Sequence, residues 1–205
     1  SCRESQGSYD WVISLTPPGS FAAVLEGANS RTPTFVPDAP GFYRITEQVS
    51  GDSIDLTAGL WVGRTFGCRG CHRHRQEKAR WEKTGHAGFF ARGVNGKVSP
   101  SYNEGCIRCH TVGYNKNASN GGFDDVQDDL GWRFPGRLRP VNFKDIPQRL
   151  RNLANIQCEN CHGPLSQHQG EKGTMAVGFG SGVCQQCHAE APYHNLGIEW
   201  ENSKH

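Results

Sequence analysis

The sequence predicts a mixed fold. We expect a small β-sandwich-like module over residues 1–63, followed over residues 64–205 by loops and short helices with little regular secondary structure. Leu, Ile, Val and Phe make up 15 of the first 63 residues but only 24 of the remaining 142. The formal charge is only +2, and five tryptophans are present. Such a chain is expected to complete its core with something other than its own side chains.

The N-terminal region carries four stretches rich in β-branched and aromatic residues, each of strand length. Turn sequences rich in proline, glycine and aspartate separate them, which favours short antiparallel strands. The four stretches are residues 9–15, 21–25, 42–49 and 54–62.

The run from Trp11 to Gly51 resembles the PKD-type immunoglobulin-like repeat. It carries Pro17-Pro18-Gly19-Ser20, the edge sequence from Pro33 to Asp38, and Gly41-Phe42-Tyr43 at the start of a strand. A full repeat is longer, so an early strand is either absent or supplied by another chain. The resemblance implies a role in assembly or spacing.

Eight of the nine cysteines form four Cys-x-x-Cys-His motifs, the attachment signature of c-type haem. The two thiols add to the haem vinyl groups, and the adjacent histidine reaches the iron. A structural zinc site would not need histidine directly after every pair. We therefore expect four c-type haems and a tetrahaem cytochrome domain over residues 64–205. The motifs are Cys68-Arg69-Gly70-Cys71-His72, Cys106-Ile107-Arg108-Cys109-His110, Cys158-Glu159-Asn160-Cys161-His162 and Cys184-Gln185-Gln186-Cys187-His188.

Five further histidines are candidate distal ligands, and four bis-histidine haems would use four of them. Met175 is the only methionine, so at most one haem can have His/Met ligation. His205 is the last residue of the sequence, so its ligation would require the tail to be held, for example by a neighbouring subunit. With His72, His110, His162 and His188, the expected metal ligands are His74, His86, His168, His194 and His205.

The haem region is expected to contain two helices, and few residues separate its successive haem motifs. One helix is expected over residues 73–84. A second is expected with Asp145 as its N-cap and Pro147 in its first turn, running into the third motif. The first cysteines of successive motifs lie 38, 52 and 26 residues apart. So little protein cannot insulate four haems, and neighbouring rings are expected in or near contact.

Three stretches resemble the tetrahaem cytochrome c-554 family, which carries electrons from hydroxylamine oxidoreductase. They are residues 68–87, with Trp81 and Thr84-Gly85-His86-Ala87, residues 106–114, and residues 158–164 with His168 downstream. The resemblance implies that His86 and His168 are distal ligands, His86 to a haem other than the first.

The sequence also departs from that family. The family's histidine before the fourth motif is missing, so His74, His194 or His205 is expected to ligate the fourth haem. The family leaves its second haem five-coordinate, a site that the spare histidines here could close. The N-terminal β-module is absent from the family.

A β-module joined to a haem-dense unit with surplus histidines resembles the extracellular OmcE-like tetrahaem cytochromes, which polymerise into conductive filaments. In these, one haem takes an axial histidine from the adjacent subunit. The resemblance implies a non-enzymatic electron-transfer protein without catalytic residues. Its expected partners are other copies of itself in a head-to-tail polymer, redox partner cytochromes and extracellular electron acceptors.

The alternative is a soluble periplasmic shuttle, or a small redox enzyme with one open haem site for nitrogen oxides or peroxide. Covalent haem attachment in the family takes place outside the cytoplasm, so we expect an extracellular or cell-surface location, or the periplasm. No stretch approaches the ~18 apolar residues of a membrane helix. No basic stripe suits nucleic acid.

Overall fold

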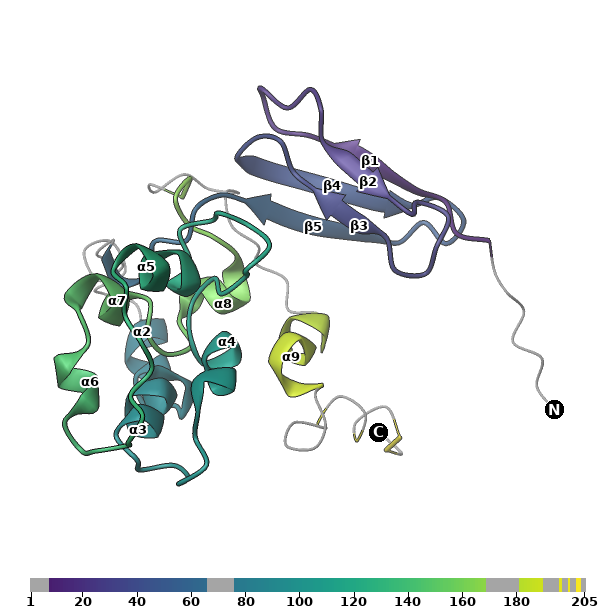
Figure 1. The fold of residues 1–205 in the computed structure, drawn as a ribbon. Helices are drawn as coiled ribbons and strands as arrows, with labels where there is room; N and C mark the ends of the chain where they lie inside the picture. Colours follow the sequence, from purple (N-terminus) through teal and green to yellow (C-terminus); the bar gives the residue numbers. More distant parts are fainter. Residues whose placement is uncertain are drawn as a thin grey trace. The chain divides into compact units, whose positions relative to one another are not determined.

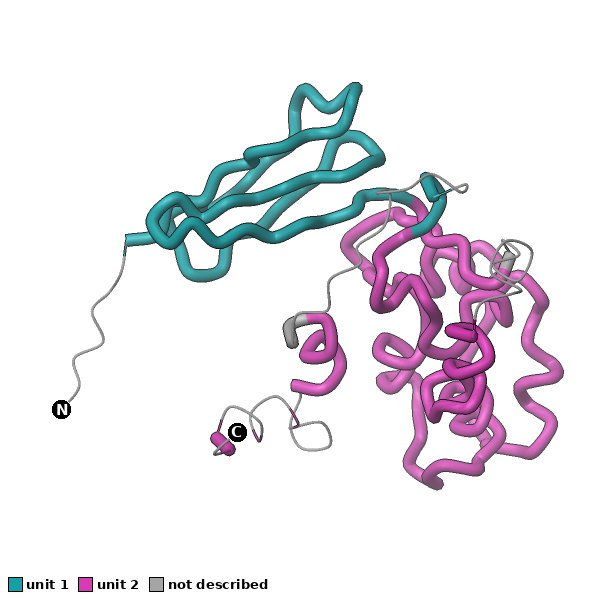
Figure 2. The backbone as a smooth tube through the Cα atoms, turned by 180° about the vertical axis from the view of Figure 1, so that it is seen from behind, with its two compact units in different colours: residues 1–59, 165–176 teal, residues 60–164, 177–205 magenta. Residues whose placement is uncertain are grey.

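The structure is a computed structural model that describes residues 8–65, 76–168 and 181–189, together with residues 196, 199, 202 and 203. The chain divides into two compact units (Figure 2). Among the described residues, unit 1 contains residues 8–59 and 165–168. Unit 2 contains residues 60–164 and 181–189, with the four isolated positions.

Unit 1 consists of two antiparallel sheets (Figure 1). The larger has the order β1-β4-β5, and β2 pairs with β3 in the smaller. Directly opposed residues share a sheet face, so the triple Ile13, Ile45 and Ile54 lies on the same face as Tyr43 and Leu56. The strands are β1 (Trp11–Leu15), β2 (Val24–Glu26), β3 (Thr34–Val36), β4 (Gly41–Glu47) and β5 (Ser53–Ala58).

Tyr43 forms the centre of the unit 1 core. Its ring is fully buried and meets Phe35 of the smaller sheet edge to face, with ring centres 5.0 Å apart. Its hydroxyl donates to the carbonyl of Ala39, four residues upstream, at 2.8 Å. A tyrosine that turns back to bond the preceding corner is a device of immunoglobulin-like sandwiches.

The second strand begins later than the sequence pattern indicates, at Val24 rather than Phe21. The backbone N–H groups of Phe21 and Ala22 donate to the Asp38 carboxylate at 2.7 and 2.6 Å, so they cannot join a ladder. These bonds, with that of Ser20 Oγ, hold the pKa of Asp38 well below its usual range. Asp38 thereby turns the residues before β2 into a loop.

Unit 2 is built from short helices joined by loops (Figure 1). Buried side chains from these helices and loops form one apolar cluster. The cluster gathers Phe90, Ile107, Phe123 and Leu150, all fully buried, from four different helices. The helices are α2 (Gln76–Trp81), α3 (Phe89–Val94), α4 (Ile107–His110), α5 (Phe123–Asp129), α6 (Asn142–Asp145), α7 (Gln148–Asn152), α8 (Cys158–His162) and α9 (Ser181–His188).

The helix expected to begin at Asp145 is instead two helices. Asp145 ends α6, and Ile146 has an extended backbone (φ −69°, ψ 135°). A residue that precedes proline is sterically excluded from the helical region, and Pro147 follows here. Then α7 stops at Asn152, and Asn155 takes a left-handed conformation (φ 70°) before the third motif. The buried side of this segment still supplies Leu150, Leu153 and Ala154 to the core.

In the part of the chain that the structure describes, no helix has both the length and the apolar character needed to cross a membrane.

Candidate haem-attachment sites

Three of the four Cys-x-x-Cys-His motifs are described by the structure. The first motif, with Cys68, Cys71 and His72, lies outside the described residues, as do the distal candidates His74, His194 and His205. The second, third and fourth motifs all belong to unit 2. Two distal candidates are described, His86 in unit 2 and His168 in a turn of unit 1, where its N–H bonds the carbonyl of Leu165.

Each described motif lies on or at the start of a helix. Cys158 to His162 form α8, Cys184 to His188 end α9, and Cys106 directly precedes α4. In a helix, residues three and four positions apart lie on one face, so both sulfurs and the imidazole are presented together. All six cysteines are thiols and none is fully buried. This donor set fits covalent attachment of a haem whose iron the histidine can reach.

The second and third motifs are joined directly. Thr111 follows His110, and its carbonyl accepts a 2.8 Å hydrogen bond from Asn160 Nδ2, inside the third motif. Thr111 also forms an antiparallel bridge with Ala154, four residues before Cys158. The two attachment helices are therefore held next to each other by a side-chain hydrogen bond to a backbone carbonyl and by a backbone bridge between the segments beside them.

The fourth motif meets the other two through its cysteines. Cys187 Sγ lies 3.8 Å from the carbonyl oxygen of Cys109. Interaction with the Cys109 side chain, together with burial, raises the pKa of Cys187. Burial, with Cys184 nearby, raises the pKa of Cys161. Cys109, Cys161, Cys184 and Cys187, which come from the three described motifs, therefore lie near one another in unit 2.

His86 faces the histidine of the fourth motif. The ring centres of His86 and His188 are 6.1 Å apart, with their planes inclined by 52°. Two imidazoles on opposite sides of one iron, each nitrogen about 2 Å from the metal and about 1 Å from its ring centre, have ring centres roughly 6 Å apart. The spacing of His86 and His188 therefore fits a bis-histidine iron site.

The ligands expected for the fourth haem, His74, His194 or His205, lie outside the described residues, so His86 is a further candidate beside them. The structure shows how His86 is held in place. Ile156 lies two residues before the third motif, and its N–H donates to the carbonyl of His86 at 3.2 Å. The indole N–H of Trp81 donates to the Ile156 carbonyl at 3.0 Å. The segment after α2 is thus fixed through contacts far apart in sequence.

Glu159 is a buried carboxylate between the cysteines of the third motif. It is 2% exposed and accepts hydrogen bonds from the backbone N–H groups of Val62 at 3.1 Å and Gly63 at 2.6 Å. Gly63 has φ +56°, and a Cβ there would lie 2.4 Å from the carbonyl oxygen of Asn152. Sequence reasoning missed this residue, because its partners lie 96 and 97 positions away.

Tyr102 is a second residue that sequence reasoning missed. Its hydroxyl oxygen lies 3.1 Å from His110 Nδ1, and its ring is stacked on the imidazole. Burial raises the pKa of Tyr102 far above its usual range, so the hydroxyl stays protonated. A lone tyrosine eight residues before a motif histidine carries no recognisable sequence signal.

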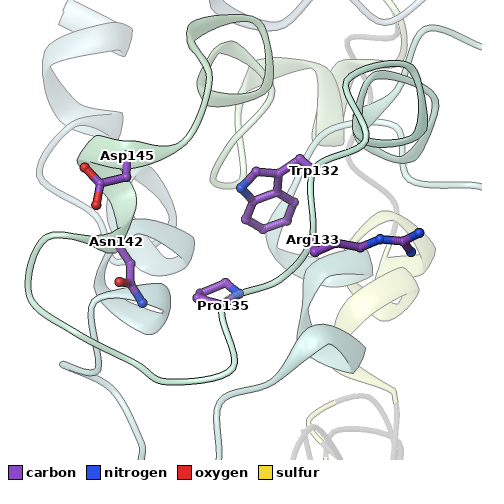
Figure 3. A pocket seen from close by; sticks show the side chains of 5 residues that line it. All are labelled: Trp132, Arg133, Pro135, Asn142 and Asp145. Atoms are coloured by element: carbon purple, nitrogen blue, oxygen red, sulfur yellow. The ribbon is translucent and has the colours of Figure 1, made fainter.

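Unit 2 also has hollows that contain no motif residue. One of about 240 Å³ is lined by Trp132, Arg133, Pro135, Asn142 and Asp145 (Figure 3). A second, of about 640 Å³, has Tyr102, Phe134 and Arg137 in its wall. Among the described residues, no cluster of three or more His, Cys, Asp or Glu side chains is arranged to hold a bare metal ion.

Three helical haem-attachment motifs with an opposed histidine pair are the features of a multihaem c-type cytochrome. Consistent with this class, the chain is 26% identical over 122 residues to "Multiheme cytochrome MtrA" of Shewanella baltica (strain OS185). The match covers 55% of this chain and 30% of that protein, so the chain spans less than a third of its relative. No family model matches the sequence. No solved structure matches it either.

Proposed function

We propose that the chain is an electron-transfer protein that holds four c-type haems, one on each Cys-x-x-Cys-His motif. The observation that carries the proposal is the convergence of three described motifs in unit 2, with His86 opposite His188. Haem iron, when bound, supplies one-electron exchange between its ferric and ferrous states. The cysteines would fix its position, and His86 with His188 would hold one iron, which would leave no place for a substrate there.

The haem count tests this proposal. The mature protein is expected to carry four covalent haems, measured by intact mass and by the alkaline pyridine haemochrome spectrum. Peptide mapping should place one haem on each motif, including Cys68 and Cys71. A mature protein with four unmodified motifs and bound zinc would contradict the proposal.

The finer proposal is an extracellular filament in which copies of the chain assemble head to tail and pass electrons to external acceptors. It is supported by the surplus of histidines, nine for eight axial positions. It is also supported by unit 1, where Val24 and Val36 oppose each other across β2 and β3 and are both about half exposed. Phe21, in the loop that Asp38 holds, is 94% exposed. Apolar side chains presented in this way favour contact with another protein surface.

Electron microscopy of concentrated holoprotein and of cell-surface extracts tests the filament. Filaments in which the iron of one subunit contacts a histidine of the next are the expected result. A compact monomer at high concentration, with every haem already six-coordinate, would contradict it. The substitution His205→Ala serves as a probe of a shared ligand, since it should abolish polymerisation without lowering the haem count if His205 is that ligand.

The competing function is a periplasmic shuttle or a small enzyme with one open haem. Coordination number separates it from a pure electron carrier. We expect only low-spin haem in the electron paramagnetic resonance spectrum of the intact assembly, and no binding of cyanide or nitric oxide. One stoichiometric high-spin haem in intact material would favour the enzyme.

We further propose that unit 1 is a PKD-like, immunoglobulin-like module with an assembly or spacing role. The two sheets and the Tyr43 hydroxyl bonded back to Ala39 support this assignment. Deletion of residues 1–59 is expected to preserve haem attachment and to abolish assembly. Normal filaments from the truncated chain would contradict the assembly role.

A further inference from the structure

The histidine of the second motif contacts two aromatic rings, which also contact each other. The Tyr102 ring is stacked on the His110 imidazole, with planes 11° apart and ring centres 5.6 Å apart. Phe89, at the start of α3, is the second neighbour, with its ring centre 4.3 Å away and a tilt of 39°. The cluster also contains a polar contact: the Tyr102 hydroxyl oxygen lies 3.1 Å from His110 Nδ1.

The position of the Tyr102 hydroxyl is fixed by packing. The side chain is 6% exposed and also contacts the Phe134 ring, with centres 6.2 Å apart. Gly93, on the facing side of α3, makes room for it, because a Cβ at Gly93 would lie 2.4 Å from the tyrosine ring. The tyrosine N–H bonds the carbonyl of Ser99 at 3.2 Å. The hydroxyl therefore cannot move away from the imidazole without disturbing the core.

We propose that Tyr102 is a positioning residue for the axial ligand His110, with its hydroxyl oxygen accepting a hydrogen bond from Nδ1–H. An imidazole that binds a metal through one nitrogen keeps its proton on the other, and the partner of that N–H fixes the tautomer and the ring orientation. With Nδ1–H directed to Tyr102, Nε2 remains for the iron. The proposal rests on the proposed function, namely a haem attached at Cys106 and Cys109.

The consequence is electronic as well as geometric. Donation from Nδ1–H to an oxygen makes the imidazole a stronger base, and a more basic ligand stabilises ferric over ferrous iron. Tyr102 therefore lowers the reduction potential of the second haem. The bond is formed by a buried tyrosine in a cluster of neutral aromatic rings, which lowers the local dielectric and strengthens its effect.

The test is the substitution Tyr102→Phe in the full-length holoprotein. Phenylalanine keeps the stacked ring and removes only the hydroxyl. One of the four haems is expected to become more easily reduced, with its reduced-to-oxidised ratio at a fixed ambient potential rising about three- to tenfold; a tenfold change corresponds to 59 mV for one electron. Tyr43→Phe is the matched control, since it removes a buried tyrosine hydroxyl from unit 1, where no described motif residue lies.

The outcomes separate this proposal from the proposed function. Peptide mapping of the wild-type protein first shows whether Cys106 and Cys109 carry haem. If no haem is attached there, the proposed function itself is contradicted. With four haems present, titration curves of Tyr102→Phe and wild type that coincide would overturn the role of Tyr102. A merely structural role would lower the melting temperature without moving one potential.

A measurement on the wild type covers the case in which Tyr102→Phe fails to fold. With ¹⁵N-labelled histidine, the Nδ1 proton of His110 is expected to exchange slowly with solvent and to show a nuclear Overhauser contact with the Tyr102 ring. Nδ1 without a proton, or with a proton that exchanges as fast as that of an exposed histidine, would overturn the proposal.

Discussion

At the scale of single residues, we propose that His86 ligates one haem iron together with His188. It faces His188 at a ring-centre distance of 6.1 Å. We predict that His86→Ala converts one of the four haems from low spin to high spin, because no second imidazole then reaches that iron. Electron paramagnetic resonance measures the change, and added imidazole should restore the low-spin signal. Lys83→Ala, an exposed change three residues away, should leave the spectrum unaltered.

Glu159 is expected to contribute to the free energy of unfolding rather than to ligate iron. Removing its carboxylate leaves the N–H groups of Val62 and Gly63 without an acceptor in a buried place. Hydrogen bonds to a charged group stabilise by roughly 1.5–3 kcal/mol, so Glu159→Ala should lower the free energy of unfolding by about 3 kcal/mol. Thermal unfolding of the holoprotein measures this loss. The exposed Glu77→Ala is the control, and equal melting temperatures for the two variants would contradict the assigned role.

At the scale of secondary-structure elements, the end of β4 depends on one ionised carboxylate. N–H groups of Asp10, Ser50 and Val49 donate to Glu47 and lower its pKa to about 2 from an ordinary 4.5. Because the folded-state pKa is depressed, this stabilisation is complete above pH 4.5 and is lost as the pH falls towards 2.

We therefore predict that unit 1 loses hydrogen-exchange protection at Asp10 and Ser50 between pH 4.5 and 2, after correction for intrinsic exchange rates. Glu47→Gln should be less protected at pH 6 and should show a weaker dependence on pH over this range. Asp52→Asn, an exposed change in the same hairpin, should follow the wild type. A pH dependence unchanged in Glu47→Gln would contradict the prediction.

The sequence pattern indicated most strands but not all of their limits. Alternating β-branched and aromatic residues anticipated β1, β4 and β5, because burial against one face leaves a local pattern. The late start of β2 could not be predicted from a local pattern, because it depends on hydrogen bonds from Phe21 and Ala22 to Asp38, which lies 17 and 16 positions further along the chain. The break between α6 and α7 was readable in principle, because Pro147 restricts Ile146 locally.

At the scale of the whole molecule, we expect unit 2 to depend on haem to complete its core. Its buried cluster contains nine described residues, five from short helices and four from the segments between them. We predict that the chain made without haem attachment lacks stable helical structure in unit 2, while the strands of unit 1 persist. Far-ultraviolet circular dichroism and hydrogen exchange of such a preparation test this. A cooperative unfolding transition in unit 2 of the haem-free chain would contradict the prediction.

The candidate site was predictable only where its chemistry is local. Five consecutive residues define a haem motif, so the four motifs were visible in the sequence. The proximity of His86 to His188 was not, because these positions are 102 residues apart. Glu159 was missed for the same reason, whereas Tyr102, eight residues before His110, was missed because a lone tyrosine carries no sequence signal.

The two residues between the cysteines of a motif have a consequence of their own. Attachment chemistry leaves them unspecified, yet Ile107 is fully buried in the core of unit 2, while Glu159 and Asn160 bond Gly63 and Thr111. The second and third motifs are therefore not interchangeable in the protein fold. Exchanging Ile107-Arg108 with Glu159-Asn160 would place an unmatched carboxylate in an apolar core. In a closely packed set of haems, the two residues between the cysteines of a motif would therefore keep each attachment helix, and the haem on it, in its own place.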